Sequence, residues 1–345
     1  MFEIVVTLCL MAEPDICRPQ LVPGLETGTR AECEAVLSGD AIRNRVTVAD
    51  GLLLREKHCQ KMADGLELTE IADNVFVHTG KIEEADPVNR GDVSNIGVII
   101  GETSIAVIDT GGSRAVGEAL YRAIRQRSSL PISHVILTHV HPDHIFGASV
   151  LAETGARVIG HPGLRRALLD REQSYLTGFE DLIGKRGFLG TLPVRPETAL
   201  QEIDLGGRVL TLNVWPTAHT TTDITVMDSA TGTLFAGDLI FHQHTPALDG
   251  SLMGWLHVLD LFPDLKPSRV VPGHGGPVLT IEEALTPMRR YLGVLEADTR
   301  QALENGERLG EAVNHVANSE ADAWELFELF NTRNATEAYT ELEWE

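Results

Sequence analysis

Residues 138–147 read THVHPDHIFG and place three histidines and an aspartate within six positions, from His139 to His144. The apolar run HVIL at 134–137 precedes them and is typical of a buried strand. Side chains just past a strand lie in a loop at the sheet edge, where they can converge on a small volume. Neutral imidazole and carboxylate groups are ligands that zinc and similar divalent ions prefer. The stretch therefore predicts a metal site.

Three further polar residues follow apolar strand-like runs in the same way. His219 comes after VLTLNV, Asp238 ends TLFAGD, and His274 comes after RVV. Taken singly, each has an ordinary explanation as a cap, turn or surface residue. Taken together, in the order HxHxDH, H, D, H, they predict side chains that gather at one edge of the sheets.

Composition narrows the class of partner. The chain has 345 residues and a formal net charge of −22, so its surface repels phosphate backbones and anionic lipid headgroups. Nucleic acid is therefore excluded as a favoured substrate. No apolar segment approaches the roughly 20 residues needed to cross a bilayer, and we expect no membrane span. A small-molecule substrate is the remaining expectation.

All four cysteines, Cys9, Cys17, Cys33 and Cys59, lie in the first sixty residues. Two disulfides that stabilise a small N-terminal segment are the favoured interpretation, and this would imply an oxidising compartment. Reduced thiols and a zinc site are the alternatives, and the sequence leaves all three disulfide pairings open. The apolar run IVVTLCLMA at the N-terminus is expected to be a buried strand, with a signal peptide as the alternative.

The rest of the chain predicts sheets covered by helices. Short β-branched runs between Gly, Asn or Asp begin at about residue 66 and alternate with helical patterns. A capping box at Thr29 and Glu32 predicts a short helix earlier in the chain. From Ile281 onward the pattern is helical. The Gly-rich residues 177–196 predict a loop, either a mobile one over a site or a plain surface connection.

With these motifs in place, the chain resembles the metallo-β-lactamase superfamily over about residues 66–280. The resemblance rests on strand-DTG at 109–111, HxHxDH at 139–144, the isolated His219, GD at 237–238 and GHG around His274. It implies an α+β fold, an αββα sandwich of two mixed sheets flanked by helices. Beside that catalytic domain we expect a Cys-containing N-terminal domain over 1–62 and a helical C-terminal extension over 281–345 that packs on it.

The resemblance also implies the roles of the site residues. His139, His141 and His219 would hold one zinc ion, Asp143, His144 and His274 a second, and Asp238 would bridge the two. Asp rather than Cys at 238 resembles the glyoxalase II-type and general hydrolase branches. Asp109 is expected to orient the imidazoles through hydrogen bonds and not to bind metal itself.

A closer resemblance is to the quinoprotein-relay-system zinc metallohydrolases. It rests on the N-terminal FEIVVTLCL extension, the GDLIF and PALDGSL segments and the C-terminal RNATEAYTELE. It implies a periplasmic location beside a quinoprotein oxidation system, although no convincing signal peptide is present; a cytoplasmic location is the alternative.

The chemistry expected is hydrolysis of an ester, thioester, lactone or amide bond by a metal-bridging hydroxide, with Asp143 orienting it and shuttling its proton. His242 and His244 are possible substrate-binding residues and equally possible solvated loop residues. A single iron at His139, His141 and His219, as in the persulfide dioxygenases that this motif also resembles, is one alternative; a β-lactamase is another. A non-catalytic maturation or binding factor is the third.

Overall fold

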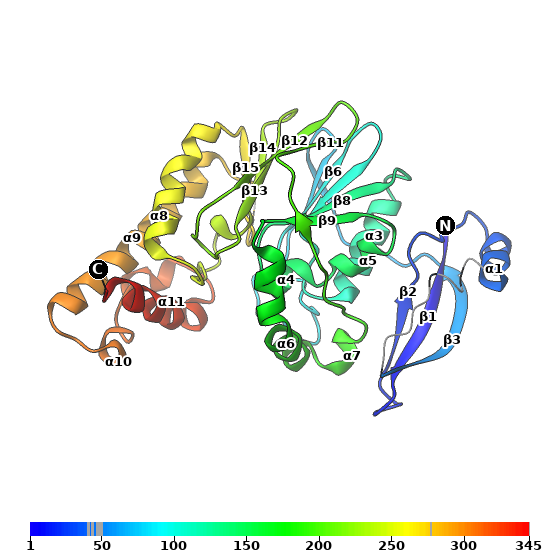
Figure 1. Ribbon diagram of the computed structural model, residues 1–345, viewed down its shortest axis with the longest axis horizontal. Coiled ribbons are helices and arrows are strands. Elements are labelled where there is room, and N and C mark those ends of the chain that lie inside the picture. The colour runs from blue at the N-terminus through cyan, green and yellow to red at the C-terminus, as the bar shows by residue number, and fades with distance from the viewer. Residues whose placement is uncertain (40–41, 43–44, 46–50, 277, 345) are drawn as a thin grey trace.

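The structure is a computed structural model, and it describes all residues except 40–41, 43–44, 46–50, 277 and 345. Three parts follow one another along the long axis in Figure 1: a small N-terminal sheet, a central pair of sheets, and a group of C-terminal helices. Among the described residues, no helix has the length and apolar character that a membrane span requires.

The N-terminal part is a three-stranded antiparallel sheet with the order β2-β1-β3. Its elements are β1 (Phe2–Leu10), β2 (Cys17–Leu21), α1 (Arg30–Ser38) and β3 (Leu52–Lys61). The predicted strand at the N-terminus is confirmed as β1, whose apolar side chains such as Ile4 and Val6 are buried. The predicted capping box is also present, since Thr29 and Glu32 each accept a hydrogen bond from the other's backbone N–H.

Two disulfides cross-link this sheet, as expected, and the structure gives their pairing. Cys9 is bonded to Cys17 and Cys33 to Cys59. The first joins opposite positions of β1 and β2, and the second ties α1 to β3. Such a small sheet buries few side chains, so covalent links supply stability that its core alone would lack.

Buried charges attach the N-terminal sheet to the central part. The guanidinium of Arg18 donates two hydrogen bonds, of 3.1 and 3.0 Å, to the carboxylate of Glu118 on α3 (Arg114–Arg125). Arg114 also donates to Glu118 at 3.0 Å and to the carbonyl of Leu21 on β2 at 3.1 Å. Both guanidinium groups are buried, so each has lost its hydration. The hydrogen bonds to the shared Glu118 carboxylate offset that desolvation cost.

The central part contains two mixed sheets, as the family resemblance implies. The larger has the order β10-β9-β8-β7-β6-β5-β4, parallel from β10 to β7 and antiparallel from β7 to β4. Its strands are β4 (Thr69–Ala72), β5 (Val75–His78), β6 (Ile96–Ile100), β7 (Ile105–Ile108), β8 (Ile132–Leu137), β9 (Arg157–Gly160) and β10 (Glu197–Thr198).

The smaller sheet has the order β11-β12-β13-β14-β15, antiparallel except for the parallel pair β14 and β15. Its strands are β11 (Glu202–Asp204), β12 (Val209–Val214), β13 (Ile224–Asp228), β14 (Thr233–Phe235) and β15 (Arg269–Val271). Side chains such as Ile99, Ile136, Val226 and Phe235 fill the space between the two sheets. The alternating runs in the sequence therefore bury one side of each sheet against the other.

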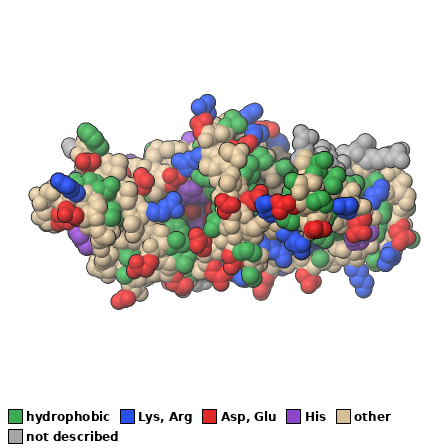
Figure 2. Space-filling view, turned by 90° about the horizontal axis from the view of Figure 1, so that it is seen from below, with side chains coloured by type: hydrophobic (Ala, Val, Ile, Leu, Met, Phe, Trp, Pro, Cys, Tyr) green, Lys and Arg blue, Asp and Glu red, His purple; other side chains and the backbone are tan. Residues whose placement is uncertain are grey.

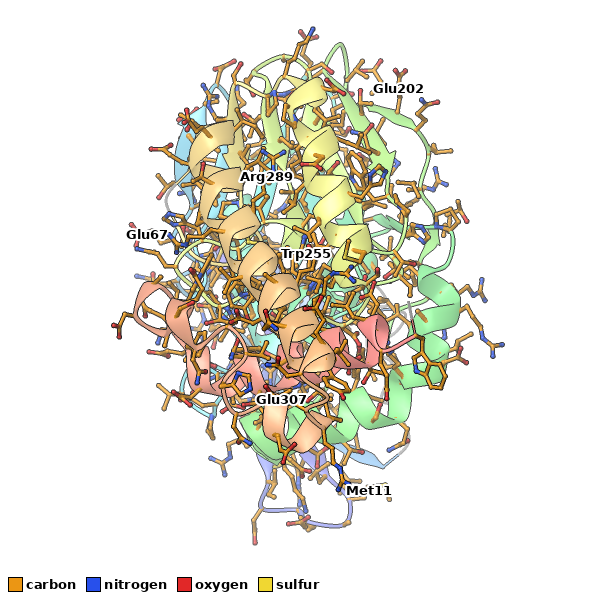
Figure 3. All side chains as sticks on the ribbon, turned by 90° about the vertical axis from the view of Figure 1, so that its left-hand side faces the viewer. Met11, Glu67, Glu202, Trp255, Arg289 and Glu307 are labelled. Atoms are coloured by element: carbon orange, nitrogen blue, oxygen red, sulfur yellow. A yellow bond between two sulfur atoms is a disulfide. The ribbon has the colours of Figure 1, made fainter. Side chains whose placement is uncertain are left out.

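Helices cover the outer faces, which completes the predicted sandwich. Those beside the larger sheet are α3, α4 (Pro142–Ile145), α5 (Ala148–Ala152), α6 (Leu164–Ile183) and α7 (Lys185–Phe188). Those beside the smaller sheet are η1 (Gly237–Leu239), α8 (Leu252–Leu261), η2 (Phe262–Leu265), α9 (Ile281–Glu304), α10 (Leu309–Ala312), η3 (Asn318–Ala323) and α11 (Phe327–Leu342). Figure 3 shows α8 and α9 side by side, with Trp255 of α8 between them and α11 crossing beneath.

The loop predicted at 177–196 is wrong for residues 177–188, which are mostly helical, and holds only after Phe188. Helix α6 continues to Ile183, past Gly178, and α7 follows directly. Leu168 and Ile183 of α6 and Phe188 of α7 are buried in the core beside the larger sheet, and this burial outweighs the low helix propensity of the glycines.

Candidate metal centre

The seven predicted ligands come together at one edge of the two sheets. His139, His141, Asp143 and His144 follow β8; His219, Asp238 and His274 follow β12, β14 and β15. The strands β12, β14 and β15 run in the same direction, so their carboxyl ends share that edge. Figure 2 views the molecule from this side and shows histidine side chains in a hollow near the middle of the face.

The backbone around His141 separates the side chains of the HxHxDH stretch. His141 has extended backbone angles and precedes Pro142, the first residue of α4. Proline favours an extended residue before it and is well placed in the first turn of a helix. The chain thus turns from strand to helix at His141, so that Asp143 and His144 reach the site from one helical turn.

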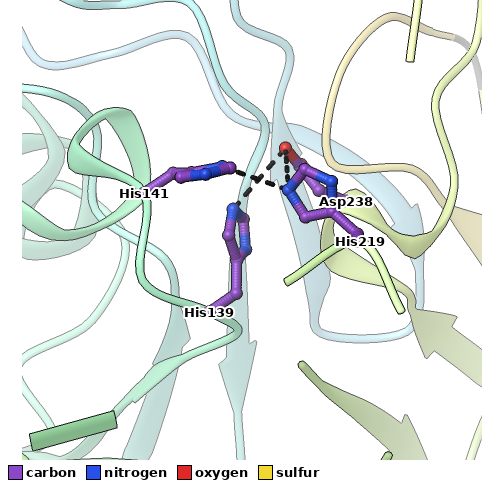
Figure 4. A group of neighbouring side chains, drawn as sticks. All are labelled: His139, His141, His219 and Asp238. Carbon is purple, nitrogen blue, oxygen red and sulfur yellow. Dashed lines mark hydrogen bonds and ion pairs between the residues drawn. The ribbon is translucent and has the colours of Figure 1, made fainter. Parts of the chain in front are cut away.

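One group consists of His139, His141, His219 and Asp238, whose candidate ligand atoms all lie within 4.8 Å of one another. Figure 4 shows the three rings and the carboxylate pointing toward a common centre. Nδ1 of His141 faces Nε2 of His219 at 3.1 Å, and Oδ2 of Asp238 lies 3.4 Å from Nε2 of His219 and 3.5 Å from Nε2 of His139.

The other group consists of Asp143, His144 and His274, with ligand atoms again within 4.8 Å. Oδ2 of Asp143 lies 3.4 Å from Nε2 of His144 and 3.2 Å from Nε2 of His274. Asp238 approaches this group too, with Oδ1 at 3.2 Å from His144 and Oδ2 at 3.3 Å from His274. Its carboxylate therefore lies between the two groups.

The ring nitrogens that face away from the centre lie beside oxygen atoms. His141 contacts Asp249, His219 the carbonyl of Ala247, His144 the carboxylate of Asp109, and His274 the carbonyl of Val93, at distances of 3.1, 2.5, 2.8 and 2.9 Å. A carbonyl or carboxylate can only accept, so the proton resides on the outward nitrogen of each ring. The inward nitrogen is therefore the one available to a cation. At His144 and His274, whose pKa the neighbouring carboxylates raise in spite of burial, the cation would replace a proton on that nitrogen.

Asp109 connects two of the imidazoles. Its Oδ2 accepts a hydrogen bond from Nδ1 of His144 at 2.8 Å and another from the hydroxyl of Thr138 at 2.7 Å. The Thr138 hydroxyl oxygen in turn accepts from Nδ1 of His139 at 2.9 Å. Asp109 has a left-handed φ of 58°, a conformation that Asp tolerates better than most residues. Asp109 belongs to neither ligand group, and the orienting role expected from the sequence stays a prediction.

The electrostatics of the cluster attract a cation. Burial alone would raise the pKa of Asp238, but the imidazoles of His144 and His274 hold it well below its usual range. Burial lowers the pKa of His219 to about 3, against the opposing charge of Asp238, so this ring is neutral at physiological pH. An ionised carboxylate beside a neutral imidazole is the donor set that a divalent ion requires.

Within the two ligand groups, two buried atoms lack a hydrogen bond, and both point to the same conclusion. They are Nε2 of His139 and Oδ1 of Asp238. Leaving such atoms unpaired costs about 1 to 3 kcal/mol each, which a bound cation would recover. The residues present therefore fit a pair of divalent ions.

The two remaining predicted histidines lie near the centre without joining it. His244 is buried, its Nδ1 lies 2.6 Å from the carbonyl of Thr245, and its ring packs against His274 and Phe330. Nδ1 of His242 lies 2.6 Å from the carbonyl of Gly276. Neither is part of the two ligand groups.

Residues that the sequence interpretation missed support the site from outside. Asp249 contacts His141 and accepts a hydrogen bond from the guanidinium of Arg171 on α6. The same guanidinium donates to the hydroxyl of Tyr175 at 2.9 Å. The only sequence signal was an Asp before a Gly in the PALDGSL segment, and this pattern is equally typical of a plain turn.

Comparison with known proteins agrees with this geometry. The sequence profile described as the metallo-beta-lactamase superfamily matches residues 89–274. The Drosophila melanogaster protein named Beta-lactamase-like protein 2 homolog is 27% identical over 187 residues, which cover 52% of this chain and 56% of that protein. The chain thus spans little more than half the length of this relative. The uncharacterized protein YobT of Bacillus subtilis is 25% identical over 46% of this chain and 73% of its own.

Solved structures share the fold at low identity. A metallo-beta-lactamase from Pontibacter korlensis aligns with a TM-score of 0.54 at 20% identity, over 66% of this chain and 99% of its own. A beta-lactamase domain protein from Burkholderia ambifaria aligns with a TM-score of 0.61 at 18% identity, over 81% and 87%. At this identity the likeness shows the fold alone.

Proposed function

Because this chain belongs to the metallo-beta-lactamase superfamily and keeps its metal site intact, consistent with a metal-dependent hydrolase, we propose that it hydrolyses a small molecule with two zinc ions. The bond cleaved would be that of an ester, thioester, lactone or amide. The observation that carries the proposal is the convergence of five imidazoles and two carboxylates. The outward ring nitrogen of each imidazole lies beside an oxygen atom.

In the proposed assignment, His139, His141 and His219 hold one ion, and Asp143, His144 and His274 hold the second. Asp238 contacts both groups and would bridge them. When bound, such a pair lowers the pKa of a shared water toward about 7 and polarises the substrate carbonyl. The complete Asp143, His144 and His274 group favours this centre over a single iron.

Asp143 is the proposed proton carrier. Its side chain is 15% exposed, whereas that of Asp238 is 3% exposed, so Asp143 is the ligand carboxylate nearer the solvent. Hydrogen bonds and charge from His144 and His274 outweigh the effect of burial and hold its pKa well below the usual range. An ionised carboxylate at this position can orient a water molecule and pass a proton outward.

Metal analysis and a substrate panel test the proposal. The protein, purified without chelator, is expected to contain about two zinc ions per chain, whereas about one iron would support persulfide oxidation. Esters, thioesters, lactones and β-lactams are then compared between wild type and His139→Ala. Turnover that is the same in both proteins would exclude the centre from the reaction.

An oxidising compartment, such as the periplasm, is part of the proposal because two disulfides link the N-terminal sheet. The association with a quinoprotein oxidation system is supported only by the sequence resemblance. If the protein were instead a non-catalytic factor for such a system, deleting residues 1–62 would abolish the biological role and leave any ester hydrolysis in place.

A further inference from the structure

The loop between η1 and α8 carries two hydrogen-bond acceptors that orient the imidazoles of His141 and His219. The carbonyl of Ala247 lies 2.5 Å from Nδ1 of His219, and Asp249 lies 3.1 Å from Nε2 of His141. The backbone N–H of Asp249 also donates to the carbonyl of His219 at 3.0 Å. The orientation of two proposed ligands therefore depends on where this loop lies.

One side chain from the far end of the sequence holds this loop. Asn334 of α11 accepts a hydrogen bond from the backbone N–H of Leu248 at 2.9 Å and donates one to the carbonyl of Pro246 at 2.6 Å. It thus contacts the residues on both sides of Ala247. Asn334 is 1% exposed, and its second N–H donates to the hydroxyl of Tyr291 on α9 at 2.7 Å.

Other contacts attach the same loop to the C-terminal part. The carbonyl of Glu325 accepts from both the N–H and the hydroxyl of Thr245, at 3.0 and 2.7 Å. The carboxylate of Glu341 on α11 accepts from Ser251 at 2.7 Å and from the N–H of Leu252 at 2.6 Å, at the start of α8. The loop is therefore held on each side of the Ala247 carbonyl.

We propose that Asn334 is a positioning residue of the metal centre. Helix α11 would then support the site, although it supplies no metal ligand. By fixing Pro246 and Leu248, it sets the carbonyl of Ala247 that orients His219. This inference rests on the proposed function, since it assumes that His219 binds metal. It goes beyond the superfamily match, which ends at residue 274, before α11 begins.

Asn331 provides a matched control on the same helix. It is 3% exposed, accepts from the hydroxyl of Tyr291 at 2.9 Å and donates to the carbonyl of Val316 at 2.9 Å. It therefore belongs to the same buried network as Asn334, but its side-chain hydrogen bonds go to Tyr291 and Val316 and not to residues 246–248. Replacement of either asparagine by leucine disturbs the core of α11, and only one replacement releases the loop.

The experiment compares full-length wild type, Asn334→Leu and Asn331→Leu. Each chelator-treated protein is titrated with cobalt(II), with the visible absorption spectrum and competition by a chromophoric chelator as readouts, and its thermal unfolding is recorded without metal. Both variants are expected to unfold at lower temperature than wild type. Only Asn334→Leu should lose affinity at one of the two sites, by about tenfold or more, with an altered cobalt spectrum.

Equal cobalt affinities in Asn334→Leu and Asn331→Leu would overturn the inference while leaving a two-metal hydrolase in place. A wild type that binds no metal would overturn the proposed function as well. If Asn334→Leu fails to fold, the same comparison is made with Asn334→Ser and Asn331→Ser, which create smaller changes in the buried network.

Discussion

Nε2 of His141 lies 3.1 Å from Oδ2 of Asp249, and the same carboxylate accepts hydrogen bonds from the guanidinium of Arg171. The contact joins a proposed ligand after β8 to the loop before α8 and to helix α6. The hydrogen bonds and charges of His141 and Arg171 outweigh partial burial and lower the pKa of Asp249. An ionised acceptor at this position keeps the proton on Nε2 and leaves Nδ1 for a cation.

Asp249→Ala should therefore weaken metal binding at the first site by about 10- to 100-fold, because His141 loses its orienting acceptor. The measurement is zinc affinity by competition with a chromophoric chelator. Asp170→Ala is the control, since Asp170 on α6 pairs with Arg166 at the surface. An Asp249→Ala protein with wild-type affinity at both sites would show that this contact does not orient His141.

Gly273→Ala should weaken metal binding at both sites, because it displaces Asp238, the carboxylate proposed to bridge the two ions. A Cβ at position 273 would lie 1.9 Å from Oδ1 of Asp238 and 2.7 Å from the backbone of Gly237, so the carboxylate has to move. Gly276→Ala is the control, since its nearest contact would be a methyl group of Thr79 at 3.3 Å. Metal content by elemental analysis should be near wild type in Gly276→Ala and reduced in Gly273→Ala; equal content in both would contradict the argument.

The proposed metal ligands could be predicted from the sequence, whereas the residues that hold them in place could not. His139, His141, Asp143 and His144 are adjacent in the chain, and the end of a strand is a local signal, so their convergence could be predicted. Asp249 and Asn334 act through contacts across 108 and 86 residues, and no local pattern marks them.

In the fold too, features with a local sequence pattern could be predicted, and features that depend on tertiary contacts could not. The alternation of strands and helices and the helix that begins at Ile281 follow from periodicity and were confirmed, whereas the arrangement in two mixed sheets was implied by the family resemblance and was confirmed too. The disulfide pairing depends on which strands become neighbours, which the spacing of the cysteines left open. Helix α6 was missed between about 177 and 183 because packing in the finished core, not local propensity, stabilises that part.

His78 and Asp92 should make stability depend on pH. Burial lowers the pKa of His78, but its hydrogen bond to Asp92, at 2.6 Å, and the charge of that carboxylate more than offset this, so the pKa is raised. The other ring nitrogen lies 3.0 Å from the carbonyl of Glu67, so only the protonated ring satisfies both acceptors. The stabilisation is fully present below the unfolded pKa and is lost as pH rises through the folded pKa.

The variant His78→Gln should accordingly lower the free energy of unfolding by about 1 to 2 kcal/mol at pH 5.5 and by less at pH 9. Urea unfolding of metal-free protein at both pH values is the measurement. His58→Gln, at a partly exposed site in the N-terminal sheet, serves as the control. A destabilisation that is larger at pH 9 would mean that His78 is held as the neutral ring.

Removing the Cys33–Cys59 disulfide should destabilise the N-terminal sheet and leave the metal centre intact. The link closes a segment with a sequence separation of 26, and such a constraint contributes about 3 kcal/mol, whereas the separation of 8 between Cys9 and Cys17 contributes less. Hydrogen exchange in the double variant Cys33→Ala/Cys59→Ala should accelerate in β1 and β3 but not in β8 or β14. Because every proposed ligand follows residue 138, zinc content should stay near wild type. Loss of zinc in this variant, with Cys9→Ala/Cys17→Ala as the comparison, would show instead that the N-terminal sheet supports the site through Arg18, Glu118 and Arg114.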